Sequence, residues 1–216
     1  MKYTHAIWDF NGTILDDVDA GILAVNRLLS ARGLPVLTDR EAYYRVFHFP
    51  IRGYYEDLGF DFSVESYEAL APQWVALYLE YAAHAPLCEG VKETLEAFRE
   101  RGLCQTLLSA TEREMLDRQV KSLGLYTYFD GLWGRDDIHA HSKVALAIAW
   151  RHAHPDAHAF VIGDTEHDRE AAETMGADCY LVAGGHQSRE TLIATGAPVF
   201  DTLTELTAFL VAEGRI

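Results

Sequence analysis

Acidic side chains stand directly after short apolar runs at two distant places in this 216-residue sequence. The stretch "AIWDFNGTILDD" places Asp9 after apolar residues and follows it with Asn11 and Thr13. The stretch "GDTEHD" follows the apolar "AFVI" and carries Asp164 and Asp168. Carboxylate oxygens and water are the ligands that Mg²⁺ takes, because this ion is small, hard and octahedral. The two stretches therefore predict a Mg²⁺ site if the fold brings them together.

A hydroxyl group and a lysine have the chemistry to complete such a site. Ser109 ends the apolar run in "LLSAT", and Lys143 opens the segment that leads to the run before Asp164. An aspartate held beside Mg²⁺ and a lysine stays ionised and can attack phosphorus. Ser109 and Lys143 can then hold the non-bridging phosphoryl oxygens. These residue types favour phosphoryl chemistry.

The elements that position these residues are predicted from hydrophobic periodicity. Strands are expected at 3–8, 103–108, 129–134, 159–162 and 179–183. Helices are expected at 17–32, 91–101, 111–123, 142–153 and 166–175, with two more near the C-terminus. The first helix should bury one face, made of Val18, Ile22, Val25 and Leu29. Thr111 with Glu114 predicts a capping box, and Ser142 is an expected N-cap.

Strands that alternate with helices of this length predict parallel βαβ units and a Rossmann-like, doubly wound α/β sheet. Residues 16–85 interrupt the alternation directly after the first strand, because they are mostly helical and rich in aromatic residues. We therefore expect a core domain made of 1–15 and 86–216, with an inserted helical domain at 16–85. Ligands of such sheets bind outside the carboxyl ends of the strands, where the acidic residues, Ser109 and Lys143 should converge.

The net charge of −15 repels nucleic acid and anionic membrane surfaces, so neither is an expected partner. It would also repel a phosphorylated substrate, unless a bound cation reverses the potential at the site. The three cysteines are widely spaced in apolar surroundings, which is typical of reduced packing residues. With no signal peptide and no apolar run of membrane-spanning length, we expect a soluble, cytoplasmic protein that is a monomer or a homodimer.

Four stretches together resemble the motifs of the haloacid dehalogenase superfamily: "IWDFNGTILDD", "LLSAT", Lys143 and "VIGDTEHDREAAETMGA". The stretches "GVKETLEAFRERGL" and "LGLYTYFDGLWG" are similar to its phosphoglycolate-phosphatase-like branch. The resemblance implies that Asp9 is a nucleophile that forms an aspartyl-phosphate. It also implies that Mg²⁺ is held by Asp9, the backbone carbonyl of Asn11 and Asp164, with Asp168 beside them.

The resemblance further implies a substrate-binding set that is divided between the two domains. In the core domain, Thr13, Ala110 and the pair Ser109 and Lys143 are expected around the phosphoryl group. The helical domain would be a cap that closes over the site, and its loop "HFPIRGYY" is expected to present His48 and Arg52 to the substrate. Arg52 suits bidentate contact with an anionic group, although it could equally be a surface residue.

Asn11 departs from the family pattern. In the family's phosphatases this position is usually a second aspartate, which protonates the leaving oxygen and then activates water. An amide cannot transfer a proton at neutral pH, and such help is worth about 10²–10⁴ in rate. Three explanations stay open. The substrate could have a good leaving group (an acyl or aryl phosphate or an anhydride), His48 could supply the proton, or the protein could bind phospho-ligands with little turnover.

Several candidates also have a purely structural interpretation. The Asn11-Gly12 pair alone is typical of a hairpin turn. Ser109 could cap a helix. Lys143 could be a solvated residue of a first helical turn, and Asp168 a first-turn acid that the helix dipole favours.

The sequence as a whole predicts Mg²⁺-dependent hydrolysis of a small phosphorylated molecule. The alternatives are a phosphotransferase or mutase, a 2-haloacid dehalogenase that uses the same nucleophile without metal, and a weakly active phospho-ligand-binding protein.

Overall fold

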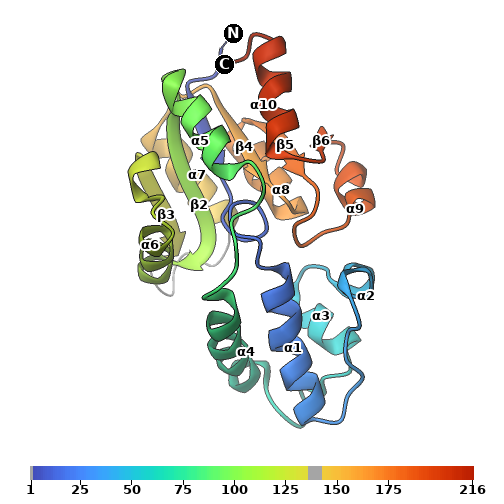
Figure 1. Ribbon diagram of the computed structural model, residues 1–216. Coiled ribbons are helices and arrows are strands. Elements are labelled where there is room, and N and C mark those ends of the chain that lie inside the picture. Colours follow the sequence, from blue (N-terminus) through green and yellow to red (C-terminus); the bar gives the residue numbers. More distant parts are fainter. Residues whose placement is uncertain (1, 136–142) are drawn as a thin grey trace. The chain divides into compact units, whose positions relative to one another are not determined.

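The computed structural model describes residues 2–135 and 143–216 (Figure 1). The chain forms two compact units. The core unit comprises Met1–Ile14 and Leu87–Ile216, and the helical unit comprises Leu15–Pro86. Ser142, the expected N-cap of a core helix, lies outside the described residues.

A six-stranded parallel sheet forms the centre of the core unit, in the order β3-β2-β1-β4-β5-β6. The strands are β1 (His5–Trp8), β2 (Cys104–Glu112), β3 (Gly131–Arg135), β4 (Ala159–Gly163), β5 (Asp178–Val182) and β6 (Val199–Phe200). From β1 the chain adds strands on one side, and from β4 it adds them on the other. The order therefore reverses between β1 and β4, and such a switch point is where open parallel sheets bind ligands.

Helices cover both faces of this sheet. They are α5 (Val91–Glu100), α6 (Arg113–Ser122), α7 (Lys143–Ala153), α8 (Glu166–Met175), α9 (Arg189–Ala194) and α10 (Leu203–Ala212), with a 3₁₀ turn, η1 (Tyr126–Tyr128). Neighbouring residues of β1 point to opposite faces: Ile7 packs in a cluster with Trp150 of α7, while the ring of Trp8 lies 5.6 Å from that of Phe98 on α5. The predicted doubly wound α/β fold is confirmed.

The helical unit consists of α1 (Val18–Ala31), α2 (Arg40–Val46), α3 (Ile51–Asp57) and α4 (Tyr67–Ala82). Its core includes the predicted apolar face of α1, which is buried at all four positions: Val18, Ile22, Val25 and Leu29. Much of the remaining core is aromatic, including Tyr43, Tyr54, Tyr55 and Phe60. At the start of α1, the buried carboxylate of Asp17 accepts a 2.6 Å hydrogen bond from the hydroxyl of Tyr78 on α4.

In the stretches 2–135 and 143–216, no helix combines the length and the apolar character that crossing a bilayer requires.

Candidate active site

Three buried aspartates gather at the carboxyl ends of the two central strands. Asp9 follows β1, and its backbone amide donates to the carbonyl of Ile162 in β4 at 2.9 Å. Asp164 follows β4, and Asp168 lies in the first turn of α8. One carboxylate oxygen from each of the three lies within 4.8 Å of the other two. The sheet thus brings together acids that are far apart in the sequence, as the parallel topology predicts.

Lys143, the first residue of α7, lies among these carboxylates. Its Nζ contacts Oδ1 of Asp9 and Oδ1 of Asp168, and its side chain is only 7% exposed. The interpretation of Lys143 as a solvated first-turn residue is therefore wrong. A buried ammonium needs such partners, because desolvation of an unpaired charge is costly.

The Asp164 carboxylate is fixed on both of its oxygens. The Thr13 hydroxyl donates to Oδ1 at 3.0 Å, and the backbone amide of His186 donates to Oδ2 at 2.6 Å. Two glycines leave room for it, since a Cβ at Gly12 would lie 2.7 Å from the Asp164 Cγ, and one at Gly185 would lie 2.5 Å from it. Thr13 therefore orients an acid of the site, and its expected contact with substrate stays a prediction.

The carboxylate of Asp168 accepts hydrogen bonds from its own loop. Its Oδ2 accepts from the backbone amide of Asp164 at 3.1 Å and from the amide and hydroxyl of Thr165 at 2.9 and 2.8 Å, while its Oδ1 contacts Lys143. Thr165 is the N-cap of α8, so Asp168 completes a capping box. Asp168 thus braces the strand-to-helix turn that carries Asp164 and positions the lysine.

Asn11 and Ser109 are joined through Thr111. The Thr111 hydroxyl donates to Oδ1 of Asn11 at 3.1 Å and accepts from the Ser109 hydroxyl at 3.0 Å. The predicted capping box of Thr111 and Glu114 is wrong. Strand β2 continues to Glu112, and the side chain of Glu112 caps α6 by accepting from the amides of residues 114 and 115.

The electrostatics of the cluster are dominated by burial. Burial raises the pKa of Asp9 well above its usual value, and the charges of Asp168 and Asp164 add to this rise while Lys143 opposes it. Burial also raises the pKa of Asp164 to about 6, which the nearby His186 opposes. Burial alone would lower the pKa of Lys143, but Asp168 and Asp9 outweigh it and raise the pKa above its ordinary value.

This donor set fits a divalent cation. Three carboxylates face one lysine, so the ionised cluster carries excess negative charge in a buried place, and its oxygens are the hard ligands that Mg²⁺ prefers. Within the part of the chain that the structure describes, this is the group of acidic side chains close enough together to hold a metal ion. All three aspartates could contribute ligands to such an ion, and Asp168 makes the most contacts of its own, four of them, to its loop and to Lys143.

The sequence profile described as "haloacid dehalogenase-like hydrolase" matches residues 6–182, which include the whole cluster. The chain belongs to the haloacid dehalogenase-like hydrolase family. The predicted resemblance is confirmed.

Individual relatives agree with this assignment. A phosphoglycolate phosphatase of Vibrio parahaemolyticus is 23% identical over 210 residues, which cover 92% of this chain and 92% of the relative. One of Synechococcus elongatus is 27% identical over 108 residues, which cover 50% of this chain and 51% of the relative. A crystal structure of a predicted phosphatase from Clostridium acetobutylicum has the same fold, with a TM-score of 0.78 at 19% identity, over 98% of this chain and 100% of that chain.

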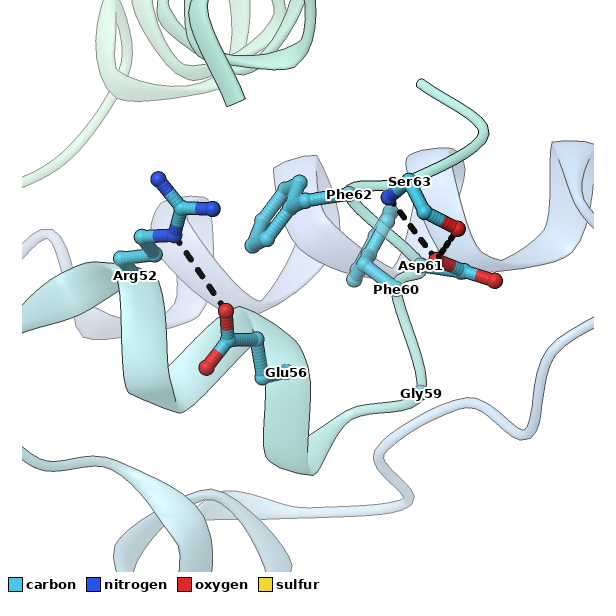
Figure 2. Close-up of a pocket in the computed structure, with 7 residues that line it drawn as sticks. All are labelled: Arg52, Glu56, Gly59, Phe60, Asp61, Phe62 and Ser63. Carbon is cyan, nitrogen blue, oxygen red and sulfur yellow. Dashed lines mark hydrogen bonds and ion pairs between the residues drawn. The ribbon is translucent and has the colours of Figure 1, made fainter. Parts of the chain in front are cut away.

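Two expected substrate-binding residues of this haloacid dehalogenase-like hydrolase belong to the helical unit. His48 Nε2 lies 3.1 Å from Oδ2 of Asp57. Arg52 donates from Nε to Glu56 at 3.2 Å, and its guanidinium carbon lies 5.1 Å from the centre of the Phe62 ring. Arg52 lines a hollow of about 580 Å³ within this unit, and its guanidinium lies beside the ring of Phe62 (Figure 2). Both side chains are engaged locally, and their contact with a substrate stays a prediction.

Sequence reasoning missed three residues of the site. His186 and Thr165 hold Asp164 and Asp168, and Thr111 holds Asn11. The signal for His186 was present, because "AGGHQ" follows a predicted strand at the same sheet edge and pairs two glycines with a polar residue. Ala110 is exposed at the end of β2, between Ser109 and Thr111, and its predicted role in substrate binding stays a prediction.

Replacing Gly12 with alanine is expected to disable the hydrolase. The new Cβ would press on Asp164 and lie 2.9 Å from Cδ2 of His186, at a backbone φ of +72°. We expect a loss of about 10²-fold in turnover, the scale of a small misplacement of reacting groups. Gly124→Ala is the matched control: its φ is +70°, and no heavy atom lies within 4 Å of the added Cβ. The positive φ should destabilise both variants by about 1–2 kcal/mol in urea denaturation, and the clash with Asp164 should make the loss larger in Gly12→Ala. Wild-type turnover by Gly12→Ala would contradict the packing argument.

Proposed function

We propose that this hydrolase cleaves the phosphate ester, acyl phosphate or anhydride bond of a small molecule, with Asp9 as the nucleophile. The observation that carries the proposal is the buried placement of the Asp9 carboxylate between Lys143 and Asp164 at the switch point of the sheet. The phosphoglycolate phosphatases among its relatives support a small phosphorylated substrate.

The chain's own residues account for both halves of the reaction. A carboxylate oxygen of Asp9 attacks phosphorus, the bond from phosphorus to the leaving oxygen breaks, and that oxygen departs with the electron pair. Water then attacks the phosphorus of the aspartyl-phosphate, releases inorganic phosphate and restores the Asp9 carboxylate. Lys143 balances the charge of the nucleophile and of the phosphoryl oxygens. Ser109, whose hydroxyl donates to Thr111 in the structure, would turn this proton to the phosphoryl oxygens when a substrate binds.

Mg²⁺ is the proposed cofactor. Asp9, the backbone carbonyl of Asn11 and Asp164 would hold it, with Asp168 beside them. The ion would supply positive charge against the non-bridging oxygens. The excess of carboxylates over lysine in the buried cluster supports this role.

The helical unit is proposed as a cap that selects the substrate. Arg52 supports this role, because its position beside Phe62 at an open hollow suits contact with an anionic group. His48 is the cap residue proposed as an alternative source of a proton.

A screen of phosphate compounds ordered by leaving-group pKa tests the function. We expect wild-type turnover to be fastest on acyl and aryl phosphates and to disappear when EDTA removes Mg²⁺. Asn11→Asp should gain about 10²–10⁴-fold on alkyl phosphates, because a carboxyl group can protonate a poor leaving group. Mass spectrometry must first exclude deamidation at Asn11-Gly12, since it would create the same variant. Turnover of no phosphate compound by either protein, with Mg²⁺ present, would rule the proposal out.

A further inference from the structure

A short chain of hydrogen bonds connects the end of β2 to the loop after β1. The backbone amide of Thr111 donates to Oγ of Ser109 at 3.1 Å. The Ser109 hydroxyl donates to Oγ1 of Thr111 at 3.0 Å, and the Thr111 hydroxyl donates to Oδ1 of Asn11 at 3.1 Å. Ser109 is almost fully buried, and Thr111 is half-buried. These hydrogen bonds therefore link Ser109 and Thr111 of β2 to Asn11, two residues after Asp9.

Each hydrogen bond of this series has a defined donor. The Ser109 oxygen accepts from the backbone N–H of Thr111, and the Ser109 hydroxyl donates its own proton to Oγ1 of Thr111. Thr111 then has a single proton left, which goes to Asn11. The Asn11 amide thus has its oxygen toward Thr111. In a planar carboxamide one N–H lies on the same edge as the oxygen and the other points to the opposite side, so fixing the oxygen also fixes the directions of both donors.

The Thr111 side chain does not cap α6. Its expected role as a helix cap is taken by Glu112, which accepts from the amides of residues 114 and 115. The Thr111 hydroxyl instead donates to the side chain of Asn11, which lies 100 positions away in the sequence.

We propose that Thr111 is a positioning residue that holds the side-chain amide of Asn11 as a fixed hydrogen-bond donor to the leaving oxygen of the substrate. An amide so held stabilises a departing oxyanion, which keeps the electron pair of the broken bond and leaves unprotonated. This device serves leaving groups that are stable as anions, namely the carboxylate of an acyl phosphate, a phenolate, or the phosphate of an anhydride. The substrate class rests on the proposed function, whereas the orientation of Asn11 does not.

The test compares Thr111→Val and Thr111→Ala, which lack the hydroxyl, with Thr111→Ser, which keeps it. The ¹H–¹⁵N side-chain amide signals of Asn11, identified by their disappearance in Asn11→Asp, are sensitive to the hydrogen bond that Oδ1 of the same amide accepts. We expect these signals to move in the valine and alanine variants and to return in the serine variant. Two hydroxyl-free variants are used, because the test can continue with the second if the first fails to fold.

Kinetics provide the second readout. Without Thr111 to orient the donor, we expect kcat to fall about tenfold, the scale of one hydrogen bond, with KM little changed. The loss should grow with the pKa of the leaving group, so a plot of log kcat against that pKa becomes steeper in Thr111→Val and regains the wild-type slope in Thr111→Ser. A purely structural role would lower kcat equally for all substrates.

Two outcomes would overturn the inference: Asn11 signals that stay in place in the hydroxyl-free variants, or an unchanged slope. Failure of the proposed function can be told apart from failure of this inference. If the protein has no Asp9-dependent phosphatase activity, the proposed function fails, but the amide signals of Asn11 still test whether Thr111 orients it. Conversely, normal Asp9-dependent turnover with unmoved signals would remove only the role of Thr111.

Discussion

Asp9→Asn is expected to lose at least about 10³-fold of the wild-type kcat, on the scale of removing a nucleophile, and to form no phosphoenzyme. Asparagine keeps the size of the side chain and can still accept from Lys143, but its amide cannot form the aspartyl-phosphate. Phosphate release under single-turnover conditions and intact-protein mass spectrometry measure the two effects.

The same substitution should not weaken the fold. Asp9 is one of three buried carboxylates that face one lysine, and burial raises its pKa well above the usual value. A raised carboxyl pKa means that the ionised group destabilises the folded state at neutral pH. We therefore expect the metal-free Asp9→Asn protein to unfold at a temperature equal to or above that of wild type. Asp156→Asn, an exposed substitution of the same kind, is the control for both readouts. Turnover near the wild-type level in Asp9→Asn would refute the nucleophile assignment.

Lys143→Met is expected to lower the free energy of unfolding by about 3–5 kcal/mol, because removing one partner of a buried ion pair leaves the other charge uncompensated. Here two carboxylates, those of Asp9 and Asp168, lose their cation at once. Methionine nearly preserves the length and the apolar stem of the side chain. The loss in the free energy of unfolding is therefore caused mainly by the missing charge and less by changed packing. Urea denaturation in EDTA measures it.

Lys121→Met provides the matched control. Lys121 also pairs with an aspartate, Asp117, but on the exposed surface of α6, where such pairs contribute little. We expect Mg²⁺ to recover part of the stability lost in Lys143→Met and to leave Lys121→Met unchanged. An equal, small loss in the two variants would contradict the buried-charge argument.

Much of the fold could be predicted from the sequence, because its elements have strong patterns. The apolar residues of β1 and β4 are buried on both faces, and the spacing of Val18, Ile22, Val25 and Leu29 matches one side of α1. Strand β6 was missed, since it has only the two residues Val199–Phe200 and no period can be detected in so short a segment. The convergence of Asp9, Asp164 and Asp168 followed from the parallel order alone.

The hydrogen bonds inside the site could not be predicted in the same way. Thr111 has the spacing of a capping residue, yet its hydroxyl binds Asn11, because β2 runs on to Glu112 and turns the threonine toward the neighbouring loop. His186 contributes through its backbone amide, a group that every residue except proline carries. Such contacts depend on where a strand ends and on how a loop turns, and residue types do not encode either one.

The position of β1 has a consequence for how the chain folds as it is synthesised. This strand is made first, yet both of its neighbours come much later: it pairs with β2 from Cys104 and with β4 from Ala159. The helical unit, Leu15–Pro86, is complete before either neighbour exists, and its packing is local. We therefore expect the helical unit to fold first on the ribosome. Until β2 and β4 are synthesised, β1 is an apolar strand with two unpaired edges, and we expect it to be the segment most prone to aggregation or chaperone binding.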